Sequence, residues 1–200
     1  MLRLVVLVSG NGTNLKAIID ANKNGLINSK VISVISNKSG VGALDIAKEN
    51  SIDATVIDKK GAEFNNILLD KLLSLKPDII VLAGFMKILP PEIIDRFKNQ
   101  IINIHPSLLP SFKGLDAQKQ AIEYGAKVSG CTVHFVDSGV DTGPIIIQSA
   151  VYIEEDDTEK SLSDKIRVEE HKIYPKVISL LERGKVQIKD DKVKILTLTN

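Results

Sequence analysis

Short apolar runs that alternate with helix-type patterns place the strongest constraint on the fold of this chain. Arg3–Val8 is such a run, and others follow at 31–35, 54–57 and 79–83, with apolar residues at helical spacing between them. Runs that are apolar at nearly every position are typical of parallel strands covered on both faces. Strands that alternate with helices form right-handed βαβ units. The sequence therefore predicts an α/β fold: an open, mostly parallel, twisted sheet with helices on both faces.

The pattern changes in the last third of the chain. Two strand-like runs, 128–136 and 145–153, follow each other with no helix between them, so they predict a long antiparallel hairpin. A long amphipathic helix is expected next, and residues 186–188 and 193–196 predict a small C-terminal antiparallel hairpin extension. No repeat or low-complexity tract divides the 200 residues, which suit one large α/β domain. We therefore expect a single domain over 1–200.

Charge and cysteine content argue against several classes of function. Lys and Arg number 26 against 25 Asp and Glu, so no global basic field favours nucleic acid as a partner. The single cysteine, Cys131, excludes an internal disulfide framework and is expected to be a buried, inert thiol. With only three histidines, no metal site is expected. The apolar run at 4–8 is too short for a signal-peptide core, and no run has transmembrane length, so we expect a cytoplasmic protein with no membrane partner.

The stretch from Asn103 to Pro110 carries the clearest candidate chemistry. Asn103 and His105 stand two apart at the end of a predicted buried strand, and this spacing puts both side chains on one face. Pro106 and Pro110 exclude a helix there. An amide beside an imidazole suits a site that donates hydrogen bonds to a developing oxyanion and moves a proton. A structural histidine that only makes a hydrogen bond is the alternative, and the local pattern leaves it open.

The connection of the predicted hairpin, 137–144, contains Asp137 and Asp141 among glycines. Ordinary turn chemistry explains both residues, because Asp-Ser-Gly and Asp-Thr-Gly are common turn formers. The functional interpretation is a carboxylate that orients His105 and raises its pKa, since a nearby negative charge favours the imidazolium. His134 either lines the same crevice or is a core histidine bonded to a neighbouring group.

Two further loops follow predicted strands, at the edge where open parallel sheets bind ligands. The loop 9–14 ends in Gly12, Thr13 and Asn14 before a helix, and backbone N–H groups at a helix N-terminus suit one phosphate group. A tight turn before a well-capped helix is the alternative. The loop 84–89 is unusually apolar, either as the wall of a pocket for a flat ligand or as a hydrophobic plug. We expect both loops and the one after His105 to converge.

With these stretches collected, the chain resembles the phosphoribosylglycinamide formyltransferase family over essentially its whole length. The motifs that carry the resemblance, in order, are 8–14, 82–89, 103–110, 130–136, 141–144 and Glu170-His171. The resemblance implies a Rossmann-like formyltransferase fold with a nucleotide-binding half at 1–100 and a catalytic and folate-binding half at 101–200. It also implies an enzyme of purine biosynthesis whose only partners are small-molecule substrates, as a monomer or homodimer.

The reaction implied is transfer of the formyl group of 10-formyltetrahydrofolate, a co-substrate, to the amine of 5'-phosphoribosylglycinamide. The amine attacks directly and a tetrahedral intermediate forms; no metal takes part. Asn103 and protonated His105 would donate to the oxyanion, while Asp141 would favour the imidazolium and take the amine proton through water. The implied ribonucleotide contacts are Gly12, Thr13, Asn14, Pro106 and Glu170. The implied folate contacts are Phe85, Met86, Lys87, Ile88, Leu89, Val136, Val140 and Asp141.

Other functions stay open at this point. A formyltetrahydrofolate deformylase-like hydrolase or a methionyl-tRNA formyltransferase shares the Asn, His and Asp positions. We expect neither here, because the chain begins at its first strand and ends soon after the hairpin, without their additional domains. A non-catalytic protein that binds nucleotide or folate is the alternative from a different class. Lys87 stands where many relatives carry Arg, which leaves open how the folate tail is held.

Overall fold

The computed structural model describes residues 1–196, and the chain divides into two compact units, Met1–Asn103 (unit 1) and Ile104–Asn200 (unit 2). The strands of the larger sheet lie in the order β3-β2-β1-β4-β5-β6-β7, and β8 and β9 form a second, two-stranded sheet. This is the expected mostly parallel α/β sheet with an antiparallel C-terminal hairpin, so the predicted fold class is confirmed.

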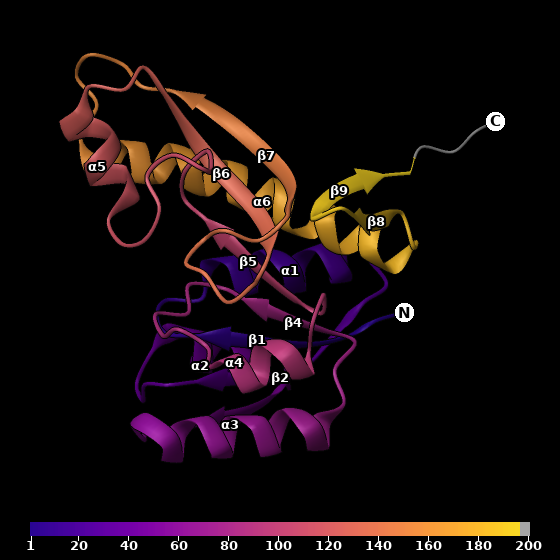
Figure 1. Cartoon of the computed structure of the whole chain (residues 1–200). Coiled ribbons are helices and arrows are strands. Elements are labelled where there is room, and N and C mark those ends of the chain that lie inside the picture. Colours follow the sequence, from indigo (N-terminus) through magenta and orange to yellow (C-terminus); the bar gives the residue numbers. More distant parts are fainter. Residues whose placement is uncertain (197–200) are drawn as a thin grey trace. The chain divides into compact units, whose positions relative to one another are not determined.

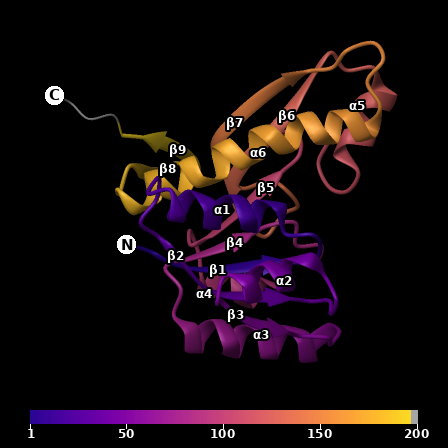
Figure 2. The ribbon, with the colours of Figure 1, turned by 180° about the vertical axis from the view of Figure 1, so that it is seen from behind.

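Unit 1 is built from parallel strands and the helices that connect them. Its strands are β1 (Arg3–Val8), β2 (Lys30–Ser36), β3 (Asp53–Val56), β4 (Ile79–Leu82) and the first part of β5 (Ile101–His105). Its helices are α1 (Thr13–Lys23), α2 (Gly42–Glu49), α3 (Gly61–Leu75) and α4 (Pro91–Arg96). In Figure 1, α4 lies in front of the sheet of unit 1. Figure 2 shows the opposite side, where α1 and α2 lie in front of that sheet. Helices therefore cover both faces.

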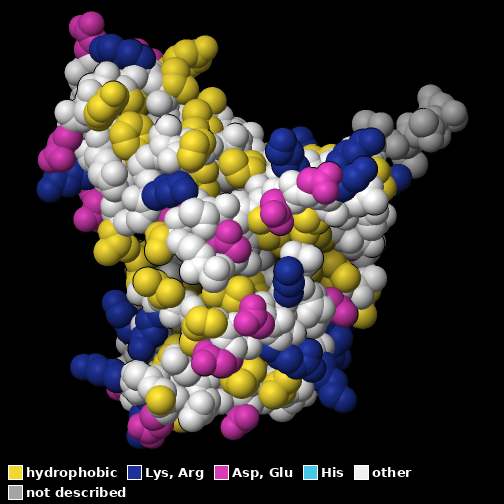
Figure 3. All heavy atoms as spheres, in the orientation of Figure 1, with side chains coloured by type: hydrophobic (Ala, Val, Ile, Leu, Met, Phe, Trp, Pro, Cys, Tyr) yellow, Lys and Arg dark blue, Asp and Glu magenta, His cyan; other side chains and the backbone are white. Residues whose placement is uncertain are grey.

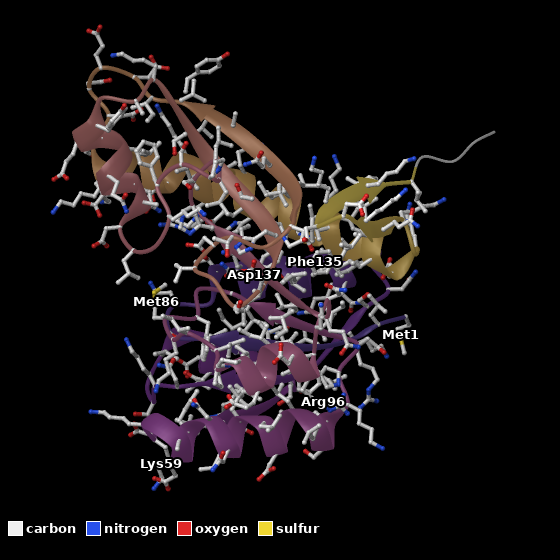
Figure 4. All side chains as sticks on the ribbon, viewed as in Figure 1. Met1, Lys59, Met86, Arg96, Phe135 and Asp137 are labelled. Atoms are coloured by element: carbon white, nitrogen blue, oxygen red, sulfur yellow. The ribbon has the colours of Figure 1, made fainter. Side chains whose placement is uncertain are left out.

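Helices on both faces of the sheet explain why these strands are apolar at nearly every position. Leu4 to Val8 of β1 are each 0% exposed, because β1 is central in unit 1 and has helices on both sides. All four residues of β4 are buried for the same reason. The parallel strands all run toward one edge of unit 1, where Figure 4 labels Met86 and Lys59, while Met1 and Arg96 lie at the opposite edge. The ligand-binding loops expected from the sequence belong to the first of these edges.

Unit 2 is organised around one long antiparallel hairpin. It is formed by β6 (Val128–Phe135) and β7 (Ile145–Tyr152), and α6 (Glu159–Glu182) packs against it, as Figure 2 shows. The helix α5 (Ala117–Tyr124) precedes β6, and β8 (Val186–Lys189) and β9 (Lys192–Ile195) form the expected terminal hairpin. Within residues 1–196 no helix combines the length and apolar character that a bilayer span requires.

Candidate active site

His105, at the end of β5, is a buried histidine whose two ring nitrogens both face oxygen atoms. Its side chain is close to fully buried, at 4% exposure. Nδ1 lies 3.2 Å from Oδ2 of Asp141, and Nε2 lies 2.8 Å from the carbonyl oxygen of Phe112. The connection between β6 and β7 therefore does fold back onto His105, and the structure brings these two predicted catalytic residues together.

Asp141 receives contacts from three separate segments of unit 2. Besides His105, the backbone N–H of Gly114 donates to Oδ2 at 2.9 Å, and Nε2 of His134 lies 3.6 Å from Oδ1. The backbone of Asp141 has a φ of 51°, a left-handed conformation that is uncommon outside glycine but accessible to aspartate. Both oxygens of the carboxylate are thus held in a fixed orientation toward the histidines.

The neighbouring residues of the connection explain how Asp141 is held there. Oδ1 of Asp137 accepts hydrogen bonds from the N–H of Gly139 at 3.1 Å and from the hydroxyl of Thr142 at 2.7 Å. The turn interpretation therefore fits Asp137, which Figure 4 labels beside Phe135 where β6 ends. A Cβ on Gly143 would lie 1.9 Å from the carbonyl oxygen of Phe135, so only glycine fits. The connection is a tightly closed turn that presents Asp141.

His134 was not among the predicted catalytic residues, yet it lies against Asp141. It is 2% exposed, and its Nδ1 donates to the carbonyl oxygen of Phe135 at 2.8 Å. The interpretation of His134 as a core histidine bonded to a neighbour is confirmed, and its ring also lies against the carboxylate of Asp141. The sequence signal for it was its position on β6, directly before the connection that carries Asp141.

The protonation of this group is a balance of opposing effects. Burial lowers the pKa of His105 and outweighs the Phe112 carbonyl and the Asp141 carboxylate, which raise it. The predicted effect of Asp141 is therefore confirmed, since its carboxylate raises the pKa of His105, but burial acts more strongly and the net shift is downward. For Asp141, burial would raise the pKa, but the contacts from His134, Gly114 and His105 together hold the pKa below its ordinary value.

The two oxygen contacts of His105 also bear on its charge state. Both the Phe112 carbonyl and an ionised Asp141 can only accept hydrogen bonds. A neutral imidazole has one N–H, so it satisfies one of these acceptors and turns a lone pair toward the other. The imidazolium has two N–H groups and satisfies both. The partners of His105 thus favour the cation while its burial favours the neutral ring, which suits a group that gains and loses a proton.

Asn103 and His105 both belong to β5, two residues apart on the same side of the strand. Asn103 pairs with Leu82 of β4 and is the one residue of β5 that is partly exposed. The sequence predicted that both side chains share one face at this strand end, which their spacing on β5 confirms. Pro106 follows directly, partly exposed, and the strand ends there.

In unit 1, the loop after β1 turns tightly at Gly12, directly before α1 begins. Gly12 precedes α1 with a φ of 77°, and a Cβ there would lie 2.7 Å from Cα of Ala43, so a larger residue does not fit. Gly12 offers the helix no side-chain cap, which argues against the well-capped turn that was the alternative. Thr13 is exposed and Asn14 is buried at the first turn.

The loop after β4 meets the loop after β1. The backbone N–H of Met86 donates to the hydroxyl of Ser9 at 2.8 Å. These two loops of unit 1 therefore converge as predicted. Leu89 is buried, but Met86 and Ile88 are 61% and 81% exposed. A loop that turns apolar side chains outward beside a ligand edge fits the pocket wall better than the hydrophobic plug.

The remaining predicted residues lie in unit 2. Glu170 is partly exposed on α6, Val136 is partly exposed where β6 ends, and Val140 is 50% exposed beside Asp141. Cys131 is buried, and burial, followed by the charges of Glu170 and Glu169, raises its pKa to about 12. The expected inert thiol is confirmed. In the part of the chain that the structure describes, no cluster of three His, Cys, Asp or Glu side chains could hold a metal ion.

Sequence reasoning missed two groups that contact the candidate pair. The carbonyl of Phe112 and the N–H of Gly114 hold His105 and Asp141, respectively, and both are backbone groups of one loop. Side-chain patterns carry no information about such groups. The only available signal was the position of this loop directly after the Asn103–Pro110 stretch.

Known proteins resemble this chain over nearly all of its length. The formyl transferase family model matches residues 2–178. The phosphoribosylglycinamide formyltransferase of Haemophilus influenzae is 43% identical over 195 residues, which cover 96% of this chain and 92% of that protein. The crystal structure of glycinamide ribonucleotide transformylase 1 from Symbiobacterium toebii has a TM-score of 0.95 and 44% identity, covering 98% of this chain and 95% of that one.

A longer protein also matches. The trifunctional purine biosynthetic protein adenosine-3 of Chironomus tentans is 46% identical over 194 residues. The match covers 94% of this chain but only 14% of that protein, so the chain corresponds to one part of it.

Proposed function

Because the chain belongs to the formyl transferase family, and to the phosphoribosylglycinamide formyltransferases within it, we propose that it transfers the formyl group of 10-formyltetrahydrofolate to the amine of 5'-phosphoribosylglycinamide. The products are formylated ribonucleotide and tetrahydrofolate. The observation that carries the proposal is the 3.2 Å contact of Asp141 with buried His105, which ends the strand that also bears Asn103. This reaction belongs to de novo purine biosynthesis.

The proposal assigns the substrate contacts residue by residue. The helix N-terminus after Gly12, with Thr13 and Asn14, takes the phosphate of the ribonucleotide. Glu170 and Pro106 contact the rest of that substrate. The folate lies against the apolar loop 84–89 and against Val136, Val140 and Asp141. Both reactants are then held together, and the proximity of amine and formyl carbon supplies a large part of the acceleration.

The chemical step begins with attack of the amine nitrogen on the formyl carbon. A C–N bond forms, and the formyl oxygen becomes an oxyanion that accepts hydrogen bonds from the amide of Asn103 and an N–H of His105. The proton lost by the amine passes to the His105–Asp141 pair through water. Collapse of the tetrahedral intermediate breaks the bond from the formyl carbon to N10 of the folate, and the proton passes to N10.

The protonation balance of His105 refines this mechanism. Since burial lowers the pKa of His105, the neutral ring is favoured before the reaction. The neutral ring can accept the amine proton, and the imidazolium that results has a second N–H for the oxyanion. Asp141 stays ionised, because its pKa is lowered, and it stabilises that cation. The pair gains positive charge as the substrate gains negative charge.

One contact must change before Nε2 of His105 can donate a hydrogen bond to the oxyanion. That nitrogen already faces the carbonyl oxygen of Phe112 at 2.8 Å. In the reacting complex the formyl oxygen takes the place of this carbonyl, and the loop that carries Phe112 moves aside. On this proposal the oxyanion takes the position at Nε2 that the Phe112 carbonyl occupies in the free protein.

The experiment that tests the proposal is a transfer assay with both substrates. Wild-type protein is expected to form the formylated ribonucleotide. Asn103→Ala and His105→Ala are each expected to lose about 100- to 1000-fold in turnover, as for a single oxyanion donor. Their circular dichroism spectra should stay unchanged. Full activity in either variant would remove that residue from the catalytic group.

Several predictions about the whole protein stay predictions. The single-domain organisation over 1–200, the monomer or homodimer and the cytoplasmic location are not tested by the geometry of the site. The assignment of nucleotide binding to 1–100 and of catalysis and folate binding to 101–200 belongs with them, and loop 84–89 already places part of the proposed folate wall in the first half.

A further inference from the structure

Lys87 lies in the loop that the proposed function assigns to folate, but its charge is turned toward unit 1 itself. Its Nζ lies 4.0 Å from the centre of the Phe64 ring. The same ammonium donates to the carbonyl oxygen of Lys59 at 3.3 Å. An ammonium over an aromatic face is a favourable arrangement, because the ring presents negative potential there. Both contacts tie the loop after β4 to the segment that enters α3.

Phe64 connects a second residue of this loop to α3. It is 2% exposed, and the ring of Phe85 stacks with it at 6.4 Å between centres and an angle of 25°. Phe64 therefore contacts the loop through Phe85 and also through Lys87. On its other side the loop is held by the N–H of Met86, which donates to Ser9. These contacts define the conformation of 84–89.

What the loop presents outward is apolar. Met86 and Ile88 are the two most exposed hydrophobic residues of the loop, and they alternate with the inward contacts of Phe85, Lys87 and buried Leu89. In Figure 3 hydrophobic and basic side chains lie next to each other on this edge of unit 1, where Figure 4 labels Met86 and Lys59. The alternation assigns an outward contact role to Met86 and Ile88, and an inward one to Lys87.

We propose that Phe64 and Lys87 form a brace that holds loop 84–89 in the shape in which Met86 and Ile88 contact the pteridine of the folate. Lys87 is then a positioning residue, and not a ligand of the carboxylates on the glutamate tail. This inference rests on the proposed function, because it names how the folate site is built. Phe64, which nothing in the sequence pattern assigned to the site, becomes part of its support.

The test separates a brace from a tail ligand by changing the folate. KM and kcat are measured with 10-formyltetrahydrofolate and with 10-formyltetrahydropteroate, which lacks glutamate. Lys87→Met removes the charge and keeps the chain length, and Phe64→Leu removes the ring and keeps an apolar side chain. A brace predicts that each variant raises KM by about three- to tenfold for both folates, with kcat nearly unchanged.

A double variant and a conservative variant test whether Phe64 and Lys87 act through the same contact. Because Phe64 and Lys87 act through one contact, Lys87→Met with Phe64→Leu should raise KM no more than either alone. Lys87→Arg keeps a cation over the ring and should restore most of the affinity. Thermal unfolding of each variant, followed separately, shows whether Phe64→Leu weakens the fold as a whole.

Three outcomes would overturn the brace. A KM penalty for Lys87→Met that appears only with the glutamate-bearing folate makes Lys87 a tail ligand. Fully additive effects in the double variant make the two residues independent, and unchanged KM values in both single variants remove the brace altogether. Each of these needs a wild-type protein that transfers formyl groups. A wild-type protein that transfers none overturns the proposed function, so the two failures are distinguishable.

Discussion

The carboxylate of Asp141 lies 3.2 Å from Nδ1 of His105, and its other oxygen lies 3.6 Å from Nε2 of His134. One carboxylate therefore meets two buried histidines. A negative charge at this distance favours the protonated form of His105, while burial of the ring opposes it. The charge of Asp141 is thus the main side-chain influence that keeps His105 able to take a proton.

Loss of that charge should be visible as a change in the titration of His105. Asp141→Asn removes the negative neighbour and leaves the burial, so the pKa of His105, already lowered, should fall further. The measurement is an NMR titration of the imidazole C–H signals, assigned with His105→Asn. His171, on α6, provides a reference whose titration should not move, because burial and Arg167 shift its pKa and Asp141 does not. An unchanged or higher pKa for His105 would mean that Asp141 does not act on its charge.

The turn that presents Asp141 should not tolerate a side chain at Gly143. Gly143→Ala places a Cβ 1.9 Å from the Phe135 carbonyl, so the connection must shift and carry Asp141 with it. A displacement on the order of 1 Å in a catalytic group can cost about 100-fold in rate, and we expect a loss of that size. Ser138→Ala, in an exposed position of the same connection, is the control and should keep its turnover. Equal activity in both variants would show that the turn does not position Asp141.

The loop after β1 should be sensitive to a side chain at Gly12. Gly12→Ala meets both a φ of 77° and a contact of 2.7 Å with Ala43, so it should destabilise the protein by more than about 1 kcal/mol and raise KM for the ribonucleotide. Gly25→Ala is the matched control: its φ is 71°, but no atom lies within 4 Å of the added Cβ. It should lose stability without any change in KM. The same KM for Gly12→Ala as for wild type would contradict the phosphate role of this loop.

The loss of stability on acidification should depend in part on Asp157. This carboxylate accepts hydrogen bonds from Lys165, Ser161 and the N–H of Glu154, and these lower its pKa from 3.8 to about 2. A carboxylate with a lowered pKa stabilises the folded state fully above its unfolded pKa, and the contribution is lost as pH falls through the folded value. The difference in melting temperature between wild type and Asp157→Asn should therefore be constant above about pH 5 and vanish toward pH 2. A difference that does not change over that window would contradict the assignment.

The strands and the first catalytic residues could be predicted because local rules decide them. Runs such as Leu4 to Val8 are apolar at every position, and only a strand covered on both faces requires that. The spacing of Asn103 and His105 puts them on one face through the geometry of an extended chain alone. Asp141 followed from the resemblance, while its own sequence context was equally consistent with a turn.

What could not be predicted depends on contacts between distant segments. The net pKa of His105 depends on how deeply the ring is buried, which neighbouring residues do not encode. The Phe112 carbonyl and the Gly114 N–H are backbone groups with no pattern of their own. The orientation of Lys87 depends on Phe64, a residue of α3, so sequence spacing gave no reason to connect them.

The most direct test is to follow both possible fates of the formyl group. Purified protein is incubated with 10-formyltetrahydrofolate, with and without 5'-phosphoribosylglycinamide, and formylated ribonucleotide and free formate are measured by mass spectrometry. The proposal predicts formylated ribonucleotide only when the acceptor is present, little formate in either tube, and a loss of at least about 100-fold in Asp141→Asn. Formate in both tubes without formylated ribonucleotide would contradict it and indicate a deformylase-like hydrolase. Folate and ribonucleotide that bind without any product would indicate a binding protein.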